Sequence, residues 1–250
     1  MSLELEPIQP EPAFRLVART IENKILTGQL LPGDALPSEA GLAEQLGVNR
    51  STIREAIRVL EQNGFVRREQ GRKKLLASIP RSADISRRLE AAMVLHQVTF
   101  EELWEAMFAL EPAAAAGAAH RRDDAHLEAL EANLEATRCA LRDSSSLTQL
   151  DIEFHALIAE ATGNRAIQIA RLPISQLFYP PFYVVMSRLN AGERLLVAHE
   201  KIVDAIRSHD EKVAREWMEK HMQDFRRGYE LANFDISAPV QVHIPDKEPI

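Results

Sequence analysis

Apolar residues recur at helical spacing in the N-terminal part of the chain. Between residues 13 and 27 they stand three or four positions apart, which predicts an amphipathic helix that ends at Gly28. Ser38 is a good N-cap for a second helix over 39–46. A third helix is predicted from Asn49, as its cap, to about residue 63, because its apolar positions fall on one side. These positions are Ile53, Ala56, Ile57 and Leu60.

The residues after Gly64 have the pattern of a hairpin. Residues 65–68 and 74–77 can form two short strands, with Gly71 and Arg72 at the tip between them. Two short helices, a polar and basic third helix and a basic hairpin, in this order, predict a winged helix-turn-helix domain over 13–78. The alternative is a small α/β domain whose basic face has no DNA-binding role.

The rest of the chain is rich in Ala, Leu, Glu and Arg, and its pattern is helical almost throughout. Residues 79–83 contain a proline and are expected to form a linker, and residues 84–234 an antiparallel bundle of about seven helices. The expected helices cover residues 84–97, 100–121, 123–142, 147–162, 164–189, 192–208 and 210–231. Residues 1–12 are expected to be a disordered tail and residues 235–250 a loose tail. The predicted fold class is therefore mostly α, a winged helix-turn-helix followed by an all-helical bundle.

The formal net charge of −7 hides an uneven distribution. Residues 13–80 hold 11 Lys and Arg against 7 Asp and Glu, so the acidic excess lies in the rest of the chain. A basic segment on an acidic protein suggests an anion-binding face, although a solvated charged surface would have the same composition. No apolar run is long enough for a transmembrane helix and the N-terminus does not resemble a secretory signal, which favours a cytoplasmic protein. A single cysteine, Cys139, excludes an internal disulfide and a zinc site built from cysteines.

The third predicted helix carries the residues best suited to DNA. Arg50, Ser51 and Thr52 lie at its N-terminal turn, where free backbone N–H groups can add to a phosphate-binding site. Arg50, Arg54 and Arg58 follow at intervals of four and so rise along one flank of the helix. From there an arginine can reach base edges in a major groove.

The segment LLPGDALPSEAGLAEQLGVNRSTIREAIRVLEQNGFV resembles the DNA-binding domain of the GntR family of bacterial transcriptional regulators. The resemblance covers roughly 65 residues. It implies that Arg50, Ser51, Thr52 and Arg54 contact DNA, and that Gly71 is the wing-tip glycine that approaches the minor groove.

The chain departs from the family pattern at two of these positions. Ala40 stands where some members have a DNA-contacting arginine, which implies a weaker or different operator. Asn49 replaces the usual Ser or Thr before the recognition arginine, and it can still cap the helix and bond a phosphate.

Four residues of the helical part have the types and spacing of a metal site. Asp151 and His155 are four positions apart and project from one helix face. His199 shares a face with Ile202 and so points to the core, and His221 lies in the last helix. Three imidazoles and one carboxylate suit a divalent ion such as Zn²⁺ or Ni²⁺. On the residues alone, hydrogen-bonded core histidines are the more common interpretation, and a metal site is the less common one.

Most of residues 84–231 resemble the FCD ligand-binding domain of FadR-type GntR regulators. Asp151 and His155 before ATGN, His199 in HEKIVDAI and the later His221 match that family's metal-binding positions, so the resemblance implies metal binding. Members often have an arginine in the first helix that holds a carboxylate of the effector, but here LWEAMFALEP has Met107 in that place. A thioether cannot form a forked ion pair. The effector is therefore either less acidic than usual or held by the metal and another basic residue.

Together these features predict a bacterial DNA-binding regulator that acts as a homodimer on a two-fold related double-stranded operator. The resemblance favours a repressor controlled by a small metabolite, such as an organic acid, with no catalytic residues and no membrane partner. One alternative is a metal-dependent enzyme that uses the Asp/His cluster, but the sequence has no HExxH motif. Another is an architectural DNA binder, which leaves the inward-facing histidines unexplained.

Overall fold

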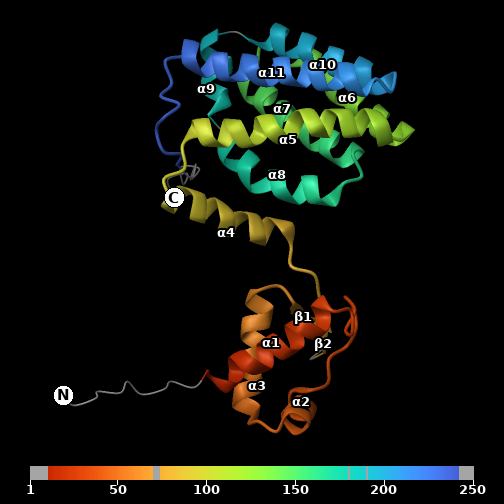
Figure 1. Ribbon diagram of the computed structural model, residues 1–250, viewed down its shortest axis with the longest axis vertical. Coiled ribbons are helices and arrows are strands. Elements are labelled where there is room, and N and C mark those ends of the chain that lie inside the picture. Colours follow the sequence, from red (N-terminus) through yellow and green to blue (C-terminus); the bar gives the residue numbers. More distant parts are fainter. Residues whose placement is uncertain (1–10, 70–73, 180, 190, 242–250) are drawn as a thin grey trace, which may run out of the picture. The chain divides into compact units, whose positions relative to one another are not determined.

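The chain divides into two units, Met1–Asp84 and Ile85–Ile250, each with its own hydrophobic core. The computed structural model describes residues 11–69, 74–179, 181–189 and 191–241 (Figure 1). The expected N-terminal tail, residues 1–12, lies almost wholly outside the described residues, as do Gly71 and Arg72 at the expected wing tip. The division falls one residue after the linker that we expected over 79–83, and the first helix of the bundle begins at Ser82.

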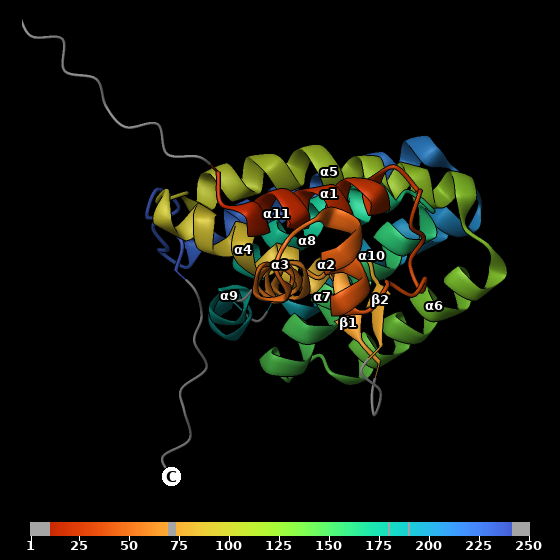
Figure 2. The same ribbon diagram turned by 90° about the horizontal axis from the view of Figure 1, so that it is seen from below.

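The first unit contains three helices and a two-stranded hairpin, as the pattern predicts. Helices α1 (Ala13–Leu26), α2 (Glu39–Leu46) and α3 (Arg50–Gln62) precede strands β1 (Val66–Arg68) and β2 (Leu75–Ala77). The strands pair antiparallel, with Val66 opposite Ala77. Figure 2 shows α3 close to end-on, with α1 running beside it. Their contact surface includes Val17 and Ile21 of α1 and Ile57 of α3, all buried. The first unit is thus a winged helix-turn-helix.

The ends of α2 and α3 are formed in different ways. The Ser38 side chain accepts a hydrogen bond from the N–H of Gly41, so the predicted cap of α2 is confirmed. Asn49 occupies the N-cap position of α3 with extended backbone, but its side chain makes no capping hydrogen bond, contrary to our expectation. The exposed first turn of α3 therefore keeps N–H groups that a phosphate oxygen can use.

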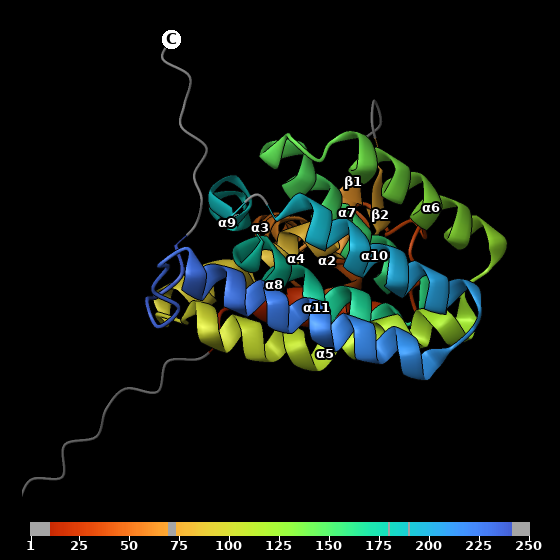
Figure 3. The same ribbon diagram turned by 90° about the horizontal axis from the view of Figure 1, so that it is seen from above.

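The second unit is a helical bundle in which α5 and α11 lie side by side, along one edge of the bundle in the view of Figure 3. Helix α11 packs along α5 on one side and α10 on the other, and α6 covers α7 and α10. Its helices are α4 (Ser82–Leu95), α5 (Phe100–Arg121), α6 (Asp124–Cys139), α7 (Ser144–Ala161), α8 (Arg165–Phe178), α9 (Phe182–Leu189), α10 (Gly192–Arg207) and α11 (Glu211–Leu231). No helix in the described part of the chain combines the length and apolar character needed to cross a bilayer.

One predicted helix is wrong in extent. The segment 164–189, expected to be continuous, forms two helices, α8 and α9. The sequence between them contains Pro180 and Pro181. Proline has no N–H to donate, and it disfavours helical geometry at the preceding residue, so two in succession end α8.

The beginning of the predicted loose tail is also held in place, which corrects our expectation for residues 235–241. The N–H of Glu101 donates to the carbonyl of Ile236, and the N–H of Val240 donates to the carbonyl of Val98. Val240 is buried, so apolar burial accompanies these hydrogen bonds. Residues 242–250 lie outside the described part.

Candidate functional site

Three helices of the bundle bring the four sequence-predicted metal ligands together. Helix α7 supplies Asp151 and His155, one turn apart on its inward face, while α10 supplies His199 and α11 supplies His221. Asp151, His155 and His199 have no exposed surface, and His221 is only 4% exposed. The predicted inward orientation of His199 is confirmed by this burial.

The four side chains converge on one small volume. The Nε2 atom of His199 lies 3.2 Å from Oδ1 of Asp151, and the Nε2 atom of His221 lies 3.7 Å from the same oxygen. The Nε2 atoms of His155 and His221 are 3.2 Å apart, and one potential ligand atom from each residue lies within 4.8 Å of the others. Ligands at about 2.1 Å from a tetrahedral ion would be about 3.4 Å apart. The spacing therefore fits a single ion.

Two members of the cluster, Asp151 and His199, have polar atoms without a hydrogen-bond partner among the described residues. Neither carboxylate oxygen of Asp151 and neither ring nitrogen of His199 has a well-formed hydrogen bond to any described residue. Buried polar atoms without partners are costly, and a bound cation would satisfy the carboxylate and the imidazoles together. The residues present thus fit a divalent metal ion.

The electrostatics of the cluster favour the protonation states that a metal requires. Burial lowers the pKa of His199 to about 3, although the nearby Asp151 carboxylate opposes this shift. Burial alone would raise the pKa of Asp151, but the contacts with His199 and His221 hold it below its ordinary value. A neutral imidazole next to an ionised carboxylate is the form in which these groups bind metals.

Two residues that the sequence analysis missed support the cluster from behind. Oε2 of Glu111 on α5 lies 2.8 Å from Nδ1 of His155, and Arg171 on α8 donates from Nε to Oε1 of Glu111 at 3.0 Å. Burial would raise the pKa of Glu111, but the neighbouring His155 and Arg171 lower it, so the carboxylate is ionised. We assign the Nδ1 proton of His155 to this contact, which leaves the Nε2 lone pair facing the cluster.

A signal for Glu111 was present in the sequence. It stands four positions after Met107, on a helix that is otherwise apolar around it, and both side chains are fully buried. A carboxylate on an inward helix face requires a cationic or hydrogen-bonding partner. The pattern did not reveal the partner, because Arg171 is 60 positions away along the chain.

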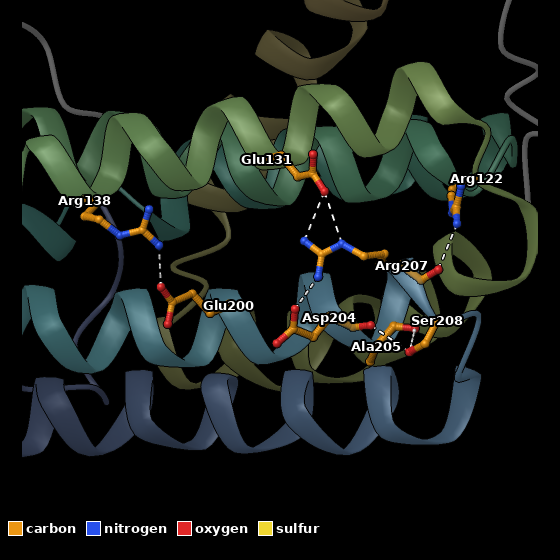
Figure 4. Close-up of polar contacts among 8 residues, drawn as sticks. All are labelled: Arg122, Glu131, Arg138, Glu200, Asp204, Ala205, Arg207 and Ser208. Carbon is orange, nitrogen blue, oxygen red and sulfur yellow. Dashed lines mark hydrogen bonds and ion pairs between the residues drawn. The ribbon is translucent and has the colours of Figure 1, made fainter.

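Ion pairs join the side of α10 that faces α6 to α6 (Figure 4). Arg138 lies 2.6 Å from Glu200, and Arg207 lies 3.0 Å from Glu131 and also pairs with Asp204. Exposed ion pairs are each worth less than about 1 kcal/mol. Here they help to orient α10, because Glu200 faces α6 while its neighbour His199 faces inward.

The sequence-predicted DNA-binding residues of α3 lie on its solvent side. Asn49, Arg50, Ser51 and Arg54 are exposed and Thr52 is half-buried, while the apolar side of the helix packs inward. Gly71 and Arg72 lie outside the described residues, so they are not placed relative to this group.

Arg54 is held by an ion pair that the sequence did not predict. Its Nε donates to Oε2 of Glu39 at 2.8 Å, and Arg68 from β1 lies 3.7 Å from the other oxygen of Glu39. This contact engages Nε of Arg54, whose side chain is otherwise largely exposed. Arg54, Arg58 and Ala40 line a groove of about 700 Å³ beside this pair.

Comparison with known proteins gives the same division of the chain. The family described as "Bacterial regulatory proteins, gntR family" matches residues 15–73, and the FCD domain matches residues 102–224. The "HTH-type transcriptional repressor NanR" of Enterobacter sp. (strain 638) is 28% identical, covering 88% of this chain and 86% of its own. The "Glc operon transcriptional activator" of Escherichia coli (strain K12) is 25% identical, covering 86% of this chain and 88% of its own.

A solved structure named "Streptococcus agalactiae GntR" is 28% identical, with a TM-score of 0.60, and covers 86% of this chain and 99% of its own. These similar proteins are regulators rather than enzymes, which removes the support for the enzyme alternative. The chain belongs to the GntR family of bacterial transcriptional regulators, in the FadR-like subfamily that joins an N-terminal DNA-binding domain to a C-terminal FCD domain.

Proposed function

We propose that this regulator is a repressor whose binding to its operator is controlled by a small metabolite held in a metal-containing FCD domain. The observation that carries the proposal is the closed Asp151/His155/His199/His221 cluster, in the same chain as an exposed cationic recognition helix. A metabolite that binds two arrangements of the protein with different affinities shifts the balance between them, and with it the affinity for DNA.

The DNA-contacting residues of the proposal are Asn49, Arg50, Ser51, Thr52 and Arg54 of the recognition helix and Gly71 and Arg72 of the wing. The serine and threonine hydroxyls and the first-turn N–H groups of α3 suit phosphate oxygens. Arg54, steadied by Glu39, suits a base edge. This division of roles supports a specific operator over non-specific binding.

The protein would bind as a homodimer to a two-fold related operator. Each chain carries one recognition helix, and one such helix reads only a few base pairs of one half-site. Two chains would double the contacts and so give the specificity that a regulator needs.

The metal would be Zn²⁺ or Ni²⁺, because three imidazoles and one carboxylate are donors that both ions accept. When bound, such an ion supplies a Lewis-acidic position at which an acidic effector can add a ligand. In this role the four side chains would hold the metal ion and orient the effector bound to it, and no bond of the effector is broken.

The repressor assignment rests on likeness to the relative named as a repressor, whereas another relative is named as an activator. The direction of regulation, repression or activation, is therefore tested with a transcriptional reporter. Its promoter overlaps a DNA duplex that the full-length protein has selected from a random pool. Lower transcription in the presence of the protein supports repression, and higher transcription overturns it.

The DNA-binding residues are tested by the affinity of the Arg54→Ala variant for the same selected duplex. Loss of a base-reading arginine costs about 1–3 kcal/mol, so affinity should fall by about 5- to 150-fold with an unchanged circular dichroism spectrum. Arg142→Ala, which removes the same charge from an exposed site of the bundle, is the matched control and should bind like the wild type. Equal affinity of the Arg54→Ala variant and the wild type would overturn the assignment of the recognition helix.

A further inference from the structure

The groove beside the ion pair of Arg54 and Glu39 is lined mostly by positive charge. It has a volume of about 700 Å³, and its charged lining residues in the described part of the chain are four cations and one acid. Helix α3 supplies Arg54 and Arg58, β1 supplies Arg68, Lys74 directly precedes β2, and Glu39 belongs to α2. A hollow lined by one sign of charge concentrates ions of the opposite sign. The groove therefore suits an anion.

Two of these cations already have acidic partners. Nε of Arg54 donates to Oε2 of Glu39 at 2.8 Å. Nε of Arg68 lies 2.9 Å from Oε1 of Glu61 on α3, and its Nη2 lies 3.7 Å from Oε1 of Glu39. These pairs join α2, α3 and β1 and offset the charge of both arginines.

The other two cations, Arg58 and Lys74, have no acidic partner. Both side chains are exposed, and neither forms an ion pair within the described ranges of the chain. The backbone at Lys74 is held in place, because its carbonyl accepts a hydrogen bond from the N–H of Glu69 at 3.0 Å. Arg58 is carried by α3, whose apolar side packs into the core of the first unit. An anion that enters the groove can pair with both of them.

Ala40 leaves the groove open on the side of α2. It lines the groove at the second position of this helix and carries only a methyl group. This wall therefore adds neither a cation nor bulk, and the unpaired cations come from α3 and the hairpin. Such an opening can admit a group that carries its charge on several oxygens, such as a phosphate.

The position of Arg58 on the recognition helix indicates which anion this is. Arg58 follows Arg50 by eight residues, which is about 12 Å along the helix axis. A recognition helix contacts base edges mainly through its N-terminal residues. Two turns farther along, a side chain lies nearer to the sugar-phosphate backbone than to the bases. The anion that fits this position is a phosphate of a DNA duplex.

We propose that Arg58 and Lys74 form a phosphate-binding site for the backbone of the bound duplex, in the groove between α2, α3 and the hairpin. The proposal rests on the operator binding proposed above and adds to it a contact that contributes affinity without reading sequence. Arg54, which lines the same groove, remains the base-reading side chain.

The test measures the affinity of the full-length protein for two duplexes over a range of KCl concentrations. One duplex is selected by the protein from a random pool, and the other is an unrelated duplex of equal length. The slope of log affinity against log salt concentration becomes shallower by about 0.9 for each phosphate contact that is lost. Arg58→Gln and Lys74→Gln should each show this change for each chain bound, and affinity for both duplexes should fall about fivefold or more at about 0.1 M salt.

The preference between the two duplexes separates a phosphate contact from a base contact. In Arg58→Gln and Lys74→Gln the ratio of the two affinities should stay as in the wild type, whereas Arg54→Ala should lower it. A wild-type salt slope in either glutamine variant would overturn the phosphate site, as would a loss of affinity confined to the selected duplex.

Two further variants control for charge and for position. Arg58→Lys retains the cation and should keep the wild-type slope, whereas a slope as shallow as that of Arg58→Gln would count against a phosphate contact. Arg142→Gln removes the same charge from an exposed position of the second unit and should bind like the wild type. All the substituted side chains are exposed, and circular dichroism and thermal unfolding verify that each variant folds.

The two proposals fail in different ways. Wild-type protein that selects no duplex from the random pool would overturn the operator-binding proposal. The salt slopes of the wild type, Arg58→Gln and Lys74→Gln on the unrelated duplex would then still decide on the phosphate site. Absence of binding to any duplex would overturn both.

Discussion

Among the residues of the cluster, His199 is the one whose charge state depends most on the fold. It is fully buried, its ring is stacked 3.6 Å from that of Phe154, and its nearest charged neighbour is Asp151. Burial lowers its pKa from 6.5 to about 3. The unfolded chain therefore binds a proton on this histidine between these values, whereas the folded chain does not.

The metal-free protein should consequently lose stability as the pH falls below about 6.5. A group with a depressed pKa in the folded state contributes stability that is present at higher pH and lost on acidification. The loss approaches about 1.4 kcal/mol per pH unit for one such histidine. Urea unfolding in the presence of a chelator, between about pH 7 and pH 5, measures this slope.

Two variants test whether His199 causes the dependence of the unfolding free energy on pH. His199→Gln should flatten it, whereas replacement of the exposed His96 by Gln should leave it as in the wild type. An unchanged slope in the His199→Gln protein would contradict the assignment.

At the scale of helices and strands, the spacing of apolar residues along the sequence was sufficient to predict most of the fold. It predicted α1, α2, α3 and the hairpin nearly to the residue, and it placed Asp151 and His155 on one face of α7. It missed the break between α8 and α9, because the apolar pattern continues across the two prolines. It also missed Glu111 and Arg171, since a contact between residues 60 positions apart depends on how α5 and α8 pack.

The separate helix α9 is held against α11 by a close contact at Gly228. A Cβ atom at this position would lie 2.9 Å from Cγ1 of Val185, closer than side chains tolerate. Gly228→Ala should therefore push α9 away and destabilise the protein by about 1–3 kcal/mol, as overpacking does in other cores. Denaturant unfolding measures the change, and Gln223→Ala on the exposed side of α11 is the control. If the Gly228→Ala variant were as stable as the wild type, α9 would not pack closely against α11 at this position.

At the scale of the whole molecule, the chain joins two cores with different tasks. The first unit presents cationic side chains on a recognition helix, and the second encloses a cluster of metal-binding type. An effector bound in the second unit can change DNA affinity only by the difference between its affinities for the two states, typically about 1–3 kcal/mol. A metal bound by the cluster would contribute to this difference by fixing three helices relative to one another.

The metal site is tested most directly by the metal content of untagged full-length protein, purified without chelator and measured by elemental mass spectrometry. We expect close to one equivalent of a divalent metal per chain in the wild type and almost none in Asp151→Asn, whose amide cannot supply the charge of the buried carboxylate. Glu153→Gln, an exposed change on the same helix, should retain the wild-type content. Wild-type protein that stays empty after incubation with Zn²⁺ and Ni²⁺, or Asp151→Asn protein that retains a full equivalent, would show that the four residues do not form a metal site.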